Sequence, residues 1–108
     1  MILTMLALAA AIQRTPATEE ERSAAMETYF ACLAKAADEN DDNRSDAMTI
    51  GLIIAPYCRS GREHVAQVWT RESKRDRVRV WFLQDLEDRA PQDAAAMVVA
   101  RRQARGVN

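Results

Sequence analysis

The chain has 108 residues, of which 48% are hydrophobic but only 6% aromatic, and its formal net charge is −1. This length allows one small domain with a thin core. Alanine, the strongest helix former, supplies much of the apolar content, whereas three glycines and three prolines are few for an all-β chain that needs frequent turns. We therefore expect an all-α fold, a small antiparallel helical bundle of four to five helices.

Residues 1–12 form an apolar run whose only polar member is Thr4. As a helix the run would be about 18 Å long, too short for a hydrocarbon core of about 30 Å. It has the length of the apolar part of a secretory signal, although no basic residue comes before Arg14. We predict that residues 1–14 are a signal peptide or a short apolar N-terminal segment, that residues 15–108 form one helical domain, and that the protein is periplasmic or secreted. A retained apolar helix packed against the fold is the alternative.

Two helices are expected in the first half of the domain. Thr18 and Glu21 have the spacing of a capping box, so a helix should begin there and follow an apolar stripe to about Ala37. The polar run 38–43 is then expected to be a solvated turn, because it lacks the glycine and the late glutamate of a calcium loop. A second helix should begin at the Ser45 cap and, being apolar on nearly all sides, should be central in the bundle.

The two cysteines, Cys32 and Cys58, fall one in each of these helices. If the first helix runs to about Asp41 and the second begins near Asp46, the cysteines lie at rises of roughly 14 and 18 Å from the turn, so an antiparallel hairpin brings them to similar depth. We predict a disulfide that clips this first hairpin, which agrees with an oxidising compartment. In a reducing cytosol they would instead be two buried thiols.

Prolines and glycines divide the rest of the chain. Pro56 should kink or end the second helix, and Ser60 with Gly61 should change the direction of the chain. Pro91 is expected in the first turn of a final helix, which Gly106 should stop.

The stretch between Gly61 and Pro91 allows two interpretations. Residues 62–69 and 78–89 carry apolar side chains at helical spacing. Residues 77–82 also alternate partly between polar and apolar side chains, so they could form a β-hairpin with 64–69. We prefer helices, because good helix formers follow and no two-residue turn separates the candidate strands.

Charge is unevenly distributed along the chain: residues 18–46 hold nine acidic and three basic side chains, and the chain from residue 59 onward holds eleven basic and seven acidic ones. Such asymmetry can favour pairing between the two halves or leave a basic face for an anionic partner. The most suggestive surface is a basic stretch flanked by two tryptophans: Trp69, Arg71, Lys74, Arg75, Arg77, Arg79 and Trp81.

This stretch has three interpretations. The simplest places both tryptophans in the core and leaves the arginines solvated or paired with the acidic first helix. In the second interpretation, the basic stretch binds an anionic envelope surface or an acidic protein. A third is single-stranded nucleic acid, held by phosphate contacts and base stacking, against which export argues.

Motifs for catalysis or metal binding do not emerge from the sequence. Cys32, Cys58 and His64 supply too few ligands at the wrong spacing for zinc, so we expect no metal and no cofactor. Cys58 and His64 would be out of phase on one helix as a nucleophile and its base, and the chain has one histidine and no glycine-rich phosphate loop.

We therefore expect a non-enzymatic exported protein with a structural or interaction role, whose partner is another protein or an anionic envelope surface. The alternative is a cytosolic nucleic-acid-binding or regulatory module that uses the basic stretch 71–79. In that case the apolar start would stay on the protein and the cysteines would stay reduced.

Overall fold

The computed structural model describes residues 15–107, and all regular elements in this range are helical, which confirms the expected all-α class. None of the described residues forms a strand, so the hairpin interpretation of residues 64–82 is wrong. The elements are α2 (Glu19–Asn40), α3 (Ala47–Ile54), the 3₁₀ turn η1 (Ala55–Cys58), α4 (Arg59–Trp69) and α5 (Asp76–Ala104).

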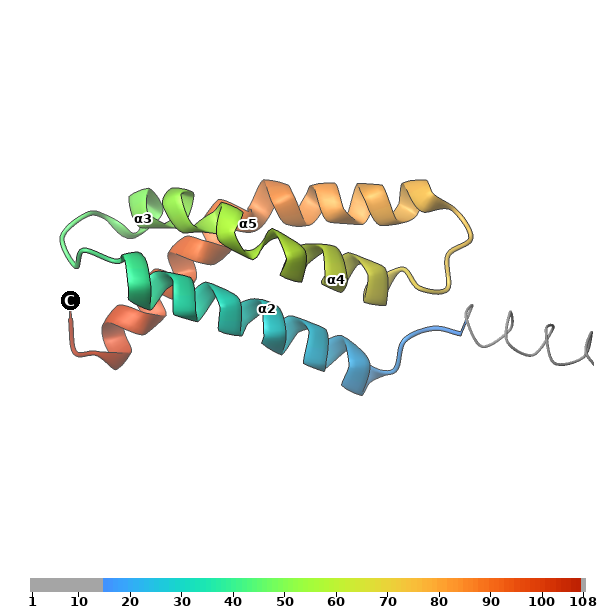
Figure 1. The fold of residues 1–108 in the computed structure, drawn as a ribbon, viewed down its shortest axis with the longest axis horizontal. Helices are drawn as coiled ribbons and strands as arrows, with labels where there is room; N and C mark the ends of the chain where they lie inside the picture. Colours follow the sequence, from blue (N-terminus) through green and yellow to red (C-terminus); the bar gives the residue numbers. More distant parts are fainter. Residues whose placement is uncertain (1–14, 108) are drawn as a thin grey trace, which may run out of the picture.

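These elements pack as three helical arms (Figure 1): α2, the continuous α3–η1–α4 arm, and α5. The expected count of four to five helices in the bundle is therefore not found. The physical reason is that no loop forms at either internal proline: the chain stays helical through Pro56 and through Pro91.

Helix α2 begins where the sequence predicted. The Thr18 hydroxyl accepts a hydrogen bond from the Glu21 amide at 3.1 Å, and the Glu21 carboxylate accepts one from the Thr18 amide at 3.2 Å. This reciprocal capping box satisfies two amide donors that a helix start leaves free. The other end lies at Asn40, close to the end near Asp41 on which the disulfide prediction relied, so α2 includes the first half of the polar run 38–43.

The α3–η1–α4 arm begins one residue later than expected and has no break in the middle. Asp46, not Ser45, caps α3 by accepting the Thr49 amide at 3.0 Å. Pro56 lies in the first turn of η1, where its missing N–H does little harm, and the chain then continues directly into α4. The expected change of direction at Gly61 is wrong, because Gly61 is helical and packs against Tyr29 of α2.

The predicted disulfide is present and joins α2 to this arm. Cys32 and Cys58 lie 5.9 Å apart between their Cα atoms, inside the range that a disulfide bridges. The two arms run antiparallel beside each other, as the hairpin prediction required (Figure 1). For a sequence separation of 26 residues, the chain-entropy model gives a stabilisation of about 3.5 kcal/mol.

The core is built largely from small side chains, and α3 lies at its edge. Ile50, Gly51 and Ile54 face α5 and are buried, but Leu52 is 59% exposed and Ile53 is 50% exposed. The expectation that this apolar helix would be central is therefore wrong, because the neighbouring arms cover only one of its sides. Seven of the buried cluster residues are alanines: Ala25, Ala36, Ala37, Ala55, Ala66, Ala90 and Ala94.

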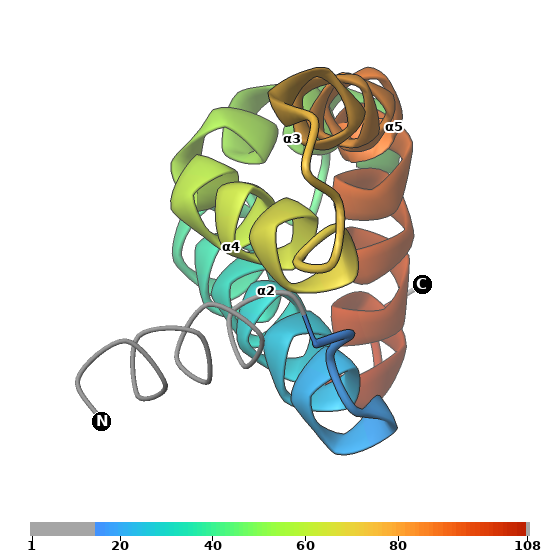
Figure 2. The same cartoon turned by 90° about the vertical axis from the view of Figure 1, so that its right-hand side faces the viewer.

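Helix α5 contains Pro91 in its interior, so the expected start of a separate helix there is wrong. Proline removes one backbone hydrogen bond and crowds the preceding turn, which bends a helix and costs about 3 kcal/mol. The two halves of α5 run in different directions, as Figures 1 and 2 show. The second half then crosses α3 at close range: a Cβ atom on Gly51 would lie 2.7 Å from the Pro91 carbonyl oxygen and 2.8 Å from the Ala95 amide nitrogen.

This close crossing predicts that Gly51→Ala destabilises the protein, even though alanine is normally the better helix residue. Its methyl group would meet backbone atoms of α5, and such overpacking costs about 1–3 kcal/mol. Thermal unfolding should therefore show a lowered Tm. Ser60→Ala, at an exposed position of the same arm, is the control and should change stability by less than about 0.5 kcal/mol. An unchanged or raised Tm for Gly51→Ala would show that the crossing is looser than described.

Candidate interaction surface

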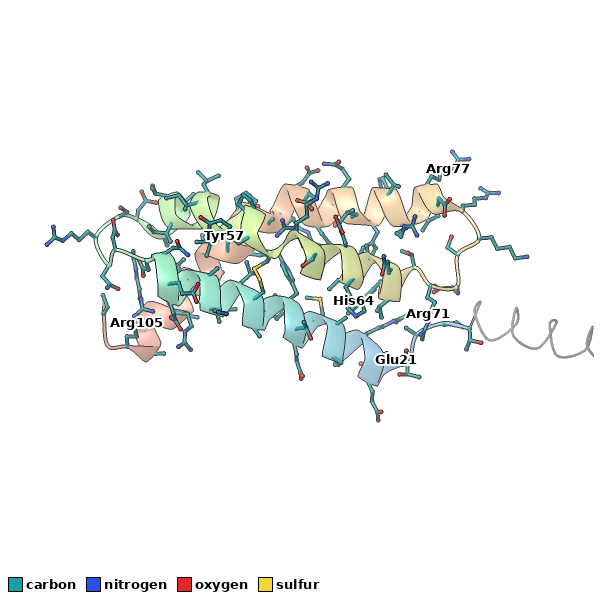
Figure 3. All side chains as sticks on the ribbon, in the orientation of Figure 1. Glu21, Tyr57, His64, Arg71, Arg77 and Arg105 are labelled. Carbon is teal, nitrogen blue, oxygen red and sulfur yellow. A yellow bond between two sulfur atoms is a disulfide. The ribbon has the colours of Figure 1, made fainter. Side chains whose placement is uncertain are left out.

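The basic stretch lies at one end of the molecule. It covers the end of α4, the connection 70–75 and the first turns of α5. Figure 3 shows Arg71 and Arg77 at this end, whereas Arg105 lies at the opposite end. The structure thus gathers the predicted surface residues in one region, but it does not give them all the same environment.

Arg71 belongs to the fold more than to a free surface. Its Nη1 lies 2.6 Å from Oε2 of Glu21, so it ties the connection after α4 to the first turn of α2 (Figure 3). The hydrogen bond from Arg71, helped by the Thr18 amide, lowers the pKa of Glu21 to about 2. For this arginine, the interpretation that the basic stretch pairs with the acidic first helix is correct.

The two tryptophans have different roles. Trp69 is partly buried against the core: its ring lies 6.4 Å from that of Phe82, and the Arg22 guanidinium lies 5.9 Å from its centre. Trp81, in contrast, is 74% exposed, so the expectation that both tryptophans pack in the core is wrong for this one. A helix turns consecutive residues about 100° apart, and α5 directs Phe82 toward Trp69 while Trp81 faces outward.

Most of the remaining cations have no acidic partner. In the described part of the chain, Lys74, Arg75 and Arg77 form no ion pair, and Arg79 lies 3.7 Å from the exposed Asp76. A single pair of this kind between exposed side chains is worth little. We call the group that remains accessible the basic–aromatic end: Lys74, Arg75, Arg77, Arg79 and Trp81.

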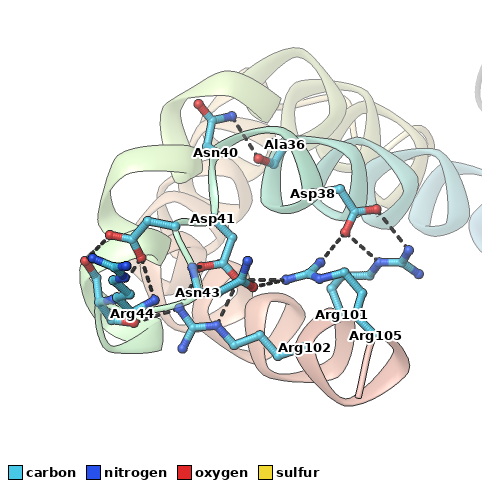
Figure 4. A network of polar contacts seen from close by, with 11 residues as sticks. Ala36, Asp38, Asn40, Asp41, Asn43, Arg44, Arg101, Arg102 and Arg105 are labelled. Carbon is cyan, nitrogen blue, oxygen red and sulfur yellow. Dashed lines mark hydrogen bonds and ion pairs between the residues drawn. The ribbon is translucent and has the colours of Figure 1, made fainter. Parts of the chain in front are cut away.

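At the opposite end, the three arginines near the C-terminus, Arg101, Arg102 and Arg105, are all paired with aspartates (Figure 4). Arg102 donates to both carboxylate oxygens of Asp41, at 2.8 and 2.6 Å, and to the Ser45 carbonyl oxygen. Arg105 bridges Asp41 and Asp38, and Arg101 makes a two-bonded pair with Asp38. Pairing between the acidic and the basic half of the chain was one of the possibilities that the charge asymmetry raised, and these contacts confirm it. The expectation that the run 38–43 is only a solvated turn is wrong, because Asp38 and Asp41 are bound by arginines.

This cluster explains why α2 extends as far as Asn40. Acidic side chains at a helix C-terminus oppose the helix dipole, and here the arginines of α5 neutralise them. The Asp41 side chain is only 1% exposed, and its pKa is lowered to about 2 by Arg102 first, with further help from the Asn43 amide and Arg105. Because these arginines lie about sixty residues further along the chain, local sequence patterns could not reveal the contact.

A buried arginine at the centre of the molecule has a structural role. The Arg62 side chain is 2% exposed, with Nε 3.2 Å from the Glu87 carboxylate. Its Nη1 donates to the Ala55 carbonyl oxygen at 2.9 Å, and its guanidinium lies over the Tyr29 ring. Arg62 thereby connects all three arms where the thin alanine core leaves room for a long side chain.

Other kinds of site find no support within residues 15–107. No group of three or more histidine, cysteine, aspartate or glutamate side chains in this range is placed to hold a metal ion, and His64 is exposed on α4 (Figure 3). None of the helices in the same range has both the length and the hydropathy that a membrane span requires. Comparisons with protein families, with curated proteins and with solved structures find no match to this chain.

The arginine cluster predicts that Asp41→Asn lowers the free energy of unfolding by about 2–3 kcal/mol, because it leaves a partly buried arginine without its counter-charge. The pKa of Asp41 is depressed in the folded state, so its contribution is complete above about pH 4 and is lost as the pH falls toward 2. Chemical unfolding at several pH values should show this part of the acid sensitivity in the wild type and not in the variant.

Glu39→Gln provides the matched control for this prediction, since Glu39 lies two residues before Asp41, in the last turn of α2, but is 61% exposed, with Lys35 at 4.0 Å. Its loss should change stability by less than about 0.5 kcal/mol. If both variants unfolded alike at every pH, the cluster would not be a stabilising contact.

Proposed function

We propose that this chain is an exported, non-enzymatic binding protein that engages an anionic partner through its basic–aromatic end. The observation that carries the proposal is the contrast between the two ends. Arginines near the C-terminus are neutralised by aspartates, whereas Lys74, Arg75 and Arg77 are exposed without acidic partners beside an exposed Trp81. A cluster of unpaired cations attracts anions and accelerates their binding.

Two features support the exported location. The Cys32–Cys58 disulfide suits an oxidising compartment, because cytosolic thiols are normally kept reduced. The apolar run 1–12 has the length of the central part of a secretory signal. That run lies outside the described residues, so this second support comes from the sequence alone.

A nucleic-acid partner, the alternative function, receives less support. Binding of single strands usually combines cations with several aromatic rings on which bases stack. One face of Trp69 is occupied by Arg22 and its neighbour is Phe82, so only Trp81 of the two tryptophans is freely presented.

The proposal predicts salt-dependent retention of the full chain on heparin-agarose, used as a generic polyanion. The triple variant Lys74→Gln, Arg75→Gln, Arg77→Gln should elute at clearly lower salt than the wild type, because screened attraction between exposed charges depends on the number of cations in the patch. These side chains are exposed, so the fold should be unaffected.

A second triple variant, Lys35→Gln, Arg44→Gln, Arg89→Gln, removes the same net charge from exposed positions elsewhere. It should elute close to the wild type. Equal elution of both triple variants would mean that the protein binds polyanions only through its overall charge, and a wild type that is not retained would contradict the proposed function directly.

A further inference from the structure

Apolar side chains are mixed with the cations at the basic–aromatic end. Besides Trp81, Val80 is 59% exposed and Val78 is 38% exposed, all on the first turns of α5. Arg77, Val80 and Trp81 are three and four residues apart, so they share the outward side of the helix. The surface therefore combines positive charge with a small, protruding apolar group.

This combination distinguishes among anionic partners. Base stacking would use Trp81 but would leave the valines exposed to water. An interface between water and lipid accommodates all of them, since tryptophan prefers the headgroup level, aliphatic side chains enter the acyl boundary, and lysine and arginine contact anionic headgroups. The long cationic side chains can also extend around the apolar group to reach the headgroups.

From these observations we propose that the anionic partner is a lipid bilayer, which the protein contacts peripherally with the start of α5, placing Val80 and Trp81 at the headgroup level. This inference rests on the proposed function, because it names the partner of the same surface. Binding by charge alone would leave Trp81 in water, whereas this inference requires that Trp81 leaves water on binding.

The test uses the native, disulfide-bonded protein as exported, with vesicles of phosphatidylcholine alone and of phosphatidylcholine mixed with phosphatidylglycerol. Co-sedimentation should show binding to the mixed vesicles and much weaker binding to the neutral ones. Each cation near an anionic surface contributes about 1 kcal/mol, so the Lys74→Gln, Arg75→Gln, Arg77→Gln variant should bind roughly a hundredfold more weakly. The Lys35→Gln, Arg44→Gln, Arg89→Gln control should bind like the wild type.

Tryptophan emission tests the apolar contact. With mixed vesicles the wild type should shift to shorter wavelength and be quenched by brominated lipid, and Trp81→Phe should bind but lose both signals, because Trp69 stays packed on the protein. Binding without quenching, equal binding to both kinds of vesicle, or equal binding of all variants would overturn the inference. Retention on heparin together with failure to bind mixed vesicles would overturn it while leaving the proposed function intact, whereas failure in both assays would remove both.

Discussion

The Cys32–Cys58 disulfide fixes how far α2 lies along the α3–η1–α4 arm, and the rest of the packing depends on this register. One turn before Cys32 lies Tyr29, and about one turn after Cys58 come Gly61 and Arg62, which both contact that tyrosine. A core built from alanines allows close approach of helices but buries little apolar area per residue. A covalent link adds stability that such a thin core supplies only in part.

Arginines have three different roles in this molecule. Arg62 is a buried connector between arms, Arg102 neutralises a helix end, and Arg77 stays exposed without a counter-charge. Net charge is nearly zero and does not separate these roles. The proposals for function depend on the third role alone, because the first two are satisfied by contacts within the fold.

Sequence patterns within a few residues predicted the helix cap and the disulfide correctly. They failed for features that depend on contacts between residues far apart in the chain. The capping box at Thr18 and the level placement of Cys32 and Cys58 depend on helical spacing, which the sequence displays directly. The interior position of Pro91 could not be predicted in this way, since its cost is offset by packing against Gly51, forty residues away. For the surface, the cations were identifiable, but the exposure of Trp81 depends on which side of α5 meets α4, and periodicity alone did not reveal it.

Intact mass of the native protein, alkylated with and without reductant, tests the clipped hairpin most directly. We expect that neither cysteine is alkylated until the protein is reduced, that both are alkylated afterwards, and that the mass corresponds to a chain without the apolar run 1–12. A chain that begins at Met1 and has both thiols alkylated without reductant would contradict it.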